Sequence, residues 1–257
     1  MTVDSAAGEP LSGQGDPTAG SLRIDGWKRY LSETRSRLPS PSVPLTAPWS
    51  VGLSSVLEGM PRVPASGARL FGALNRLGGM SMSPESVGFD GESVRWSDVT
   101  EIRTGPLLDV LSSTAIDREI DRILSKLPPV PFRKRLVKML AELLAGLSLG
   151  VVQTAVQRST AAGELEEPTV PMAVVYSARF GRKRELRPGL FATLCCAALP
   201  GVLDAMTHTA SSRGIPVVAA TPARARRHAD SAQAVIASLE SRFRKAQDSP
   251  KDADLES

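Results

Sequence analysis

Two short alternating runs of apolar and polar residues meet at Asp90-Gly91, and this junction constrains the fold more than any other stretch of the chain. Asp-Gly is typical of a two-residue type I′ turn, in which both central residues take a positive φ and the backbone twist matches the flanking strands. We therefore expect residues 86–103 to contain a β-hairpin. Period-two spacing places the apolar residues of its strands on one face, which is predicted to be a wall of the core. These residues are Val87, Phe89, Val94 and Trp96.

The rest of the chain mixes short β-type runs with segments of helical periodicity. We predict strands at residues 80–83, 100–103, 172–178, 185–187 and 215–219. We predict helices at residues 21–38, 114–127, 132–158, 190–199, 202–213 and 232–243, with Thr114 and Gly214 as caps. Residues 39–48 hold four prolines and are expected to be an extended connector. Residues 69–77 fit a strand or one helical turn equally well.

These elements predict an α+β protein with a small antiparallel sheet, four or more packed helices and disordered termini. The length of 257 residues allows one large domain or two small ones. We divide the chain into a disordered tail (1–20), a docking helix with a Pro-rich connector (21–67), an α+β core (68–246) and a second disordered tail (247–257). Residues 114–160 would form a helical insertion within the core.

The run MSMSPESVGFDGESVRWSDVTEIR, residues 80–103, resembles the opening strands of bacterial pleckstrin-homology-like domains. In that family an Asp-Gly or Asn-Gly turn and a strand ending in Trp precede a polar-Asp-hydrophobic step, matched here by residues 96–99. The resemblance covers about a tenth of the chain, implies a role in binding lipid, peptide or a partner protein, and assigns no ligand residue. Two predicted helices interrupt the pattern before the run at Met172. Either a helical insertion splits the barrel of such a domain, or the two share only a hairpin.

A long apolar segment, Met139–Val156, has basic residues on both sides. Its length is near the lower limit of about 17 to 25 residues for a membrane span, but it contains Glu142. We therefore favour a buried core helix over a span. In a peripheral alternative, the basic residues at the start of this helix contact anionic headgroups while the helix stays folded in the protein. These residues are Arg133, Lys134 and Arg135.

A second basic cluster lies in YSARFGRKRELRPG, residues 176–189, where two short β-type runs are predicted to form a hairpin. At a hairpin tip, basic side chains project into solvent and can bind phosphate or carboxylate groups. A solvated turn is the plain alternative. Phe180 lies within the cluster but could equally pack inward, so base stacking is not favoured. The cluster comprises Arg179, Arg182, Lys183, Arg184 and Arg187.

We find no sequence motif for catalysis, and we predict no catalytic residue, no cofactor and no metal. The two histidines, His208 and His228, lie in different segments, and neither has a Cys or another His at ligand spacing. The adjacent Cys195 and Cys196 lie in an apolar run, where a thiol is expected to be inert. Cysteine usage and the lack of a secretory signal pattern lead us to expect a cytoplasmic protein, with the membrane periphery as an alternative location.

The functional hypothesis follows from the basic clusters. We predict a non-catalytic binding or scaffold protein whose partner is an acidic protein or an anionic membrane surface. The formal net charge of +4 is compatible with such partners. Nucleic-acid binding through the same clusters is the first alternative, and an enzyme with a dispersed active site is the second.

Overall fold

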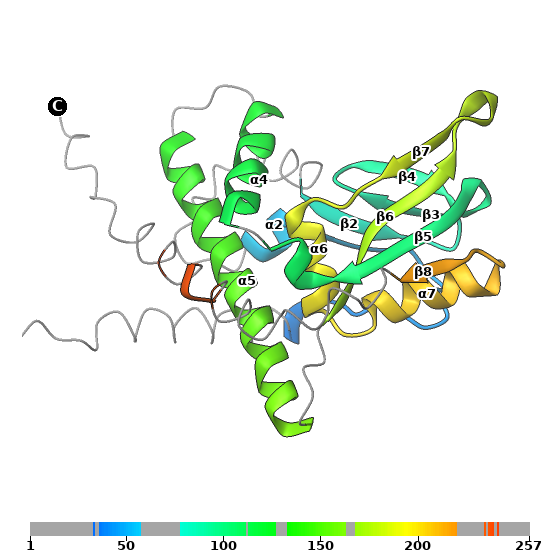
Figure 1. Cartoon of the computed structure of the whole chain (residues 1–257). Coiled ribbons are helices and arrows are strands. Elements are labelled where there is room, and N and C mark those ends of the chain that lie inside the picture. Colours follow the sequence, from blue (N-terminus) through cyan, green and yellow to red (C-terminus); the bar gives the residue numbers. More distant parts are fainter. Residues whose placement is uncertain are drawn as a thin grey trace, which may run out of the picture.

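The computed structural model describes residues 33, 36–57, 78–111, 113–126, 133–162, 168–219, 234, 236–238 and 241. The predicted tails, segment 69–77 and most of the first and last predicted helices lie outside these residues. Two four-stranded sheets and four helices of seven residues or more confirm the α+β class (Figure 1). The single small sheet expected from the sequence is therefore two sheets, and the described strands do not close into one barrel.

The first sheet has the strand order β1-β2-β3-β4 and is antiparallel throughout. The predicted hairpin forms here, with φ values of 53° at Asp90 and 82° at Gly91, as a type I′ turn requires. Val87, opposite Val94, is buried, as is Phe89, so the predicted wall of the core is confirmed. The strands are β1 (Trp49–Gly52), β2 (Gly79–Met82), β3 (Ser86–Phe89) and β4 (Glu92–Arg95).

The edge strand β1 and the short helix α2 (Leu53–Leu57) were not predicted, because four or five residues carry little periodicity. The indole N–H of Trp49 donates a hydrogen bond of 2.6 Å to the carbonyl oxygen of Pro39. Leu45, inside the Pro-rich stretch, is buried in the core. Residues 39–48 therefore pack against the core of the protein and are more than an extended connector.

Trp96 directly follows β4, the last strand of the first sheet. It lies in a 3₁₀ turn, Trp96–Asp98, with its ring buried and its indole N–H donating to the carbonyl oxygen of Ser83 at 2.9 Å. The turn directs the next strand, β5, out of the first sheet. The strand expected at residues 100–103 is thus not a continuation of the meander but the start of the second sheet.

The second sheet has the order β7-β6-β5-β8. Its strands are β5 (Val99–Pro106), β6 (Thr169–Ser177), β7 (Lys183–Leu186) and β8 (Val217–Ala219). β5 and β6 pair antiparallel, as do β6 and β7, which confirms the second predicted hairpin. β8 pairs parallel to β5, so the sheet is mixed rather than purely antiparallel as expected.

The helices are α4 (Ser113–Lys126), α5 (Arg133–Ala162), α6 (Leu190–Ala198) and α7 (Val202–Ser212). α6 is the central helix, since it contacts β2 of the first sheet, β6 of the second, and α4, α5 and α7. Gly214 follows α7 with a φ of 70°, as predicted for its cap. Thr114 lies inside α4 rather than at its cap, because the helix begins one residue earlier.

The apolar segment of α5 packs into the core, where Leu140, Leu143 and Leu144 are fully buried. Within the described residues, no single helix is long and apolar enough to cross a membrane. Only α6 and α7 taken together reach that length and composition, across a bend of 95°. Both helices contribute fully buried residues to the core, among them Phe191 and Met206.

Candidate functional site

The β6–β7 hairpin projects from the body of the protein, and its turn lies on the opposite side of the molecule from α4 and α5 (Figure 1). Cross-strand pairing continues outward from Val174 and Leu186 to Ser177 and Lys183. Two backbone hydrogen bonds then close the turn. The Ala178 N–H donates to the Arg182 carbonyl at 2.8 Å, and the Gly181 N–H donates to the Ala178 carbonyl at 3.1 Å.

Phe180 forms the apex of this turn, and its residue surface is 99% exposed. Its backbone is left-handed, with φ 66° and ψ 26°, and Gly181 follows with φ 70°. A bulky residue with positive φ is rare, and this conformation costs roughly 1–2 kcal/mol for an L-residue. Sequence reasoning left the direction of this ring open, and the structure directs it into solvent.

Four basic residues surround the apex, and all of them are exposed. Within the described part of the chain, none of the four forms an ion pair. The hairpin register places Arg184 opposite Tyr176 and Lys183 opposite Ser177. The five residues that we call the tip cluster are Arg179, Phe180, Arg182, Lys183 and Arg184. The tip cluster therefore presents uncompensated positive charge around an exposed aromatic ring.

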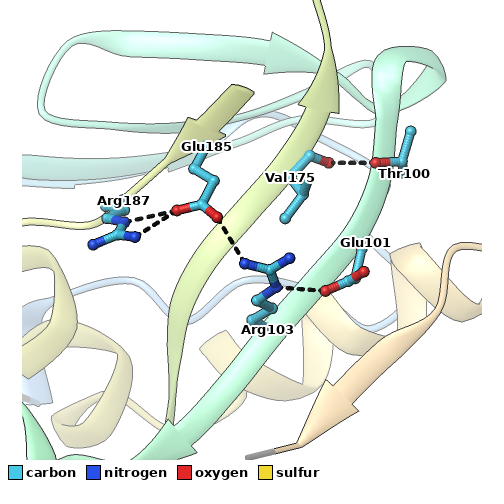
Figure 2. A network of polar contacts seen from close by, with 6 residues as sticks. All are labelled: Thr100, Glu101, Arg103, Val175, Glu185 and Arg187. Atoms are coloured by element: carbon cyan, nitrogen blue, oxygen red, sulfur yellow. Dashed lines mark hydrogen bonds and ion pairs between the residues drawn. The ribbon is translucent and has the colours of Figure 1, made fainter. Parts of the chain in front are cut away.

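Arg187 belongs to a different set of contacts (Figure 2). Its Nη2 lies 2.6 Å from Glu185 Oε2, while Arg103 Nη1 lies 2.7 Å from Glu185 Oε1. Arg103 Nε also lies 2.5 Å from Glu101 Oε1. Hydrogen bonding from Arg187, together with the charges of Arg187 and Arg103, lowers the pKa of Glu185. The charge of Arg187 is thus compensated locally, which separates this residue from the tip cluster.

The first predicted basic group is not brought to the same place. Arg133, Lys134 and Arg135 form the first turn of α5, and their side chains lie outside what the structure describes. α5 and the hairpin turn lie on different sides of the molecule (Figure 1). The eight predicted binding residues therefore separate into the four basic residues of the tip cluster, the compensated Arg187 and the three residues of the α5 group.

A second charged cluster, which the sequence did not predict, is largely buried where α4, α6 and the β3–β4 turn meet. Arg122 contacts Glu119 through two nitrogens, Nε at 2.9 Å and Nη2 at 2.8 Å, and its Nη2 lies 3.3 Å from Asp90 Oδ2. Asp90 also accepts from the backbone N–H groups of Gly79 and Gly189, at 3.3 and 2.9 Å. Burial is the main cause that raises the pKa of Asp90, although Arg122 opposes it. These groups satisfy one another and hold the elements together, so we assign them a structural role.

Cys195 and Cys196 are buried in α6. Desolvation raises the pKa of Cys195 well above its ordinary value and that of Cys196 to about 12. Such thiols carry almost no thiolate at neutral pH and are poor nucleophiles. Among the described residues, no group of three or more His, Cys, Asp and Glu side chains is placed to hold a metal ion.

Comparisons of the chain with protein-family models, curated proteins and solved structures gave no match. The resemblance of residues 80–103 to pleckstrin-homology-like domains accordingly stays a prediction.

Proposed function

We propose that this chain is a non-catalytic binding protein that engages an anionic partner through the tip cluster, in the cytoplasm or at the cytoplasmic face of a membrane. The observation that carries the proposal is the set of four exposed basic side chains that have no ion-pair partner within the described residues. Phosphate or carboxylate groups of a partner would supply the missing counter-charge.

Electrostatics supports this role. Like charges within a few residues of one another lie inside the Debye length of about 8 Å at physiological salt, so they repel one another. Anion binding relieves that repulsion and gains charge-assisted hydrogen bonds, especially from the planar guanidinium groups of Arg179, Arg182 and Arg184. The hairpin projects from the body of the protein (Figure 1), and these side chains are exposed, so they are accessible to a large partner.

Nucleic acid is the second candidate partner. The exposed ring of Phe180 beside basic side chains could stack on an unpaired base. Proteins that bind single strands combine several such rings along a basic groove, whereas the tip cluster offers one ring. An acidic or lipid partner therefore ranks above nucleic acid.

The test measures binding to a panel of anionic probes at low and at physiological salt: polyglutamate, a single-stranded oligonucleotide and vesicles containing phosphatidylserine. We compare the wild type with Arg182→Ala/Lys183→Ala. The matched control, Arg37→Ala/Lys126→Ala, removes the same charge at two exposed sites outside the hairpin. We expect salt-sensitive binding to at least one probe, weakened roughly 25-fold in the tip variant at about fivefold per charge and little changed in the control. Binding of no probe at low salt, or equal losses in both variants, would overturn the proposal.

A further inference from the structure

We propose that the partner is an anionic lipid bilayer, and that Phe180 inserts at the boundary between headgroups and acyl chains while the basic residues of the tip cluster contact the headgroups. This inference rests on the proposed function, because it names the partner of the same tip cluster. It goes further by assigning Phe180 the role of an apolar anchor.

The backbone at the apex supports the anchor role. Phe180 takes the left-handed conformation, which disfavours a bulky residue, and its residue surface is 99% exposed. Neither feature gains stability for the isolated fold, because an exposed ring buries almost no apolar surface and Asn or Gly fits this backbone better. Backbone strain of this kind gathers at sites that contact ligands. The turn thus presents the aromatic ring of Phe180 to any partner that binds the hairpin.

The arrangement around the apex matches the layers of a membrane surface. Basic residues precede and follow Phe180 in the turn, where they can reach lipid phosphates once the ring is inserted. Tyr176 lies behind them, half-buried and opposite Arg184 in the register. Tyrosine is typical of the interfacial zone, where one end of the side chain is apolar and the other is hydrated.

The shape of the hairpin favours a bilayer over a protein. A stable protein interface buries roughly 800 Å² on each partner, which requires a broad complementary surface. The tip cluster is a projecting point with one exposed aromatic residue (Figure 1). A fluid bilayer can accommodate the inserted hairpin tip without a preformed pocket, whereas a folded acidic protein would need a cavity that matches it.

The experiment compares vesicles of phosphatidylcholine with vesicles that also contain phosphatidylserine, by sedimentation and tryptophan fluorescence. Phe180→Ser should weaken binding to the anionic vesicles about tenfold at fixed salt, because the apolar contribution is lost. Its salt dependence should stay as in the wild type, since all basic residues remain. The matched control, Val218→Ser, removes an exposed apolar side chain from the edge strand β8 and should leave binding unchanged.

Insertion is read directly from Phe180→Trp. Trp49 and Trp96 are buried in the core, and Trp27 lies outside the described residues, so the comparison is made in a Trp27→Phe background. In that background the emission of Phe180→Trp should shift to the blue on anionic vesicles, and brominated lipids should quench it beyond the level seen without the new tryptophan. Equal vesicle binding by wild type and Phe180→Ser, with no added quenching, would overturn the anchor while leaving the proposed function intact. Binding to polyglutamate or the oligonucleotide but not to vesicles would also overturn it. Binding to no anionic probe would overturn both proposals.

Discussion

The backbone N–H of Gly189 donates a hydrogen bond of 2.9 Å to the Oδ2 atom of Asp90, a residue 99 positions earlier in the chain. Asp90 is a central residue of the β3–β4 turn, and Gly189 is the N-cap of α6. Glycine has no side chain with which to cap a helix, and the carboxylate of the distant turn contacts the backbone there instead. This hydrogen bond joins the Asp90-Gly91 turn, the clearest local motif of the sequence, to α6, the central helix of the fold.

Gly189→Ala should destabilise the protein strongly. A β-carbon at this position would lie 2.6 Å from Asp90 Oδ2, 2.7 Å from Arg122 Nη2 and 2.8 Å from Glu119 Oε1. These atoms belong to a largely buried charged cluster that cannot move apart without losing its ion pairs, so we expect a loss of about 2–4 kcal/mol in the free energy of unfolding. Gly214→Ala is the control, because no atom lies within 4 Å and only its positive φ opposes the change. Urea unfolding of both variants checks the difference; equal losses would contradict the packing argument.

Asp90→Asn should change how stability depends on pH. Because burial raises the pKa of Asp90 above its ordinary 3.8, the folded protein holds this proton more tightly than the unfolded chain does. The stabilisation from the neutral form is complete below pH 3.8 and is lost as the pH rises through the folded pKa. Asn does not titrate, so the Asp90→Asn variant should not lose stability as the pH rises through this range. Asn also tolerates the positive φ of this position, so the turn should be kept. In urea unfolding at several pH values, the wild type should lose stability relative to Asp90→Asn as the pH rises through this window; a relative gain would reverse the sign of the argument.

The local elements of this fold were largely predictable, and the long-range contacts were not. Asp90-Gly91 specified its hairpin because turn geometry depends on adjacent residues only. The short β-type run at residues 100–103 predicted a strand, but nothing local could indicate that β5 joins a second sheet beside β8, more than a hundred residues later. The charged cluster of Asp90, Glu119 and Arg122, with its hydrogen bond from the Gly189 backbone, could not be predicted for the same reason.

The candidate site also divides into local features, which could be predicted, and long-range features, which could not. Its basic residues and the hairpin that carries them could be read from the sequence, because both follow from neighbouring residues. The outward direction of Phe180 depends on the φ values of the turn, and the ion pair between Arg103 of β5 and Glu185 of β7 depends on the order of the strands. The sequence offered one signal for the unusual turn at Phe180, namely the glycine that follows it in a charged segment. Glycine favours positive φ, and Gly181 takes it here, as Phe180 does.

The two cysteines should be inert in the folded protein. Both thiols are buried, and Cys196 Sγ lies 3.2 Å from Met80 Sδ, so desolvation and packing both oppose attack. We expect a chromogenic disulfide reagent at pH 8 to label neither thiol in the native protein and both in denaturant. Ser93→Cys, which adds a thiol at an exposed position of β4, should react at once and serves as the positive control. Rapid labelling of a native thiol would show that α6 opens readily.

Phe180→Gly should stabilise the protein and weaken the proposed binding to anionic membranes. Glycine takes positive φ without the penalty of a β-carbon, and the exposed ring contributes almost no packing. We expect the free energy of unfolding to rise by about 1 kcal/mol, as seen in guanidinium unfolding, while binding to anionic vesicles falls. Phe180→Ala keeps the β-carbon and should not give this gain, which separates relief of backbone strain from loss of the ring. A destabilised Phe180→Gly variant would mean that the ring supports the turn.

Glu185→Gln should strengthen binding to anionic partners. Glu185 is the acidic residue of β7 between the tip cluster and Arg187, and it contacts both Arg187 and Arg103. Its removal adds one unit of positive charge to the hairpin and frees Arg187 for headgroups, so vesicle affinity should rise roughly fivefold at physiological salt. The gain should shrink as salt is added, because it is electrostatic. Glu92→Gln, an exposed carboxylate change on β4, is the charge-matched control. If both variants gained equally, the effect would belong to net charge and not to the hairpin.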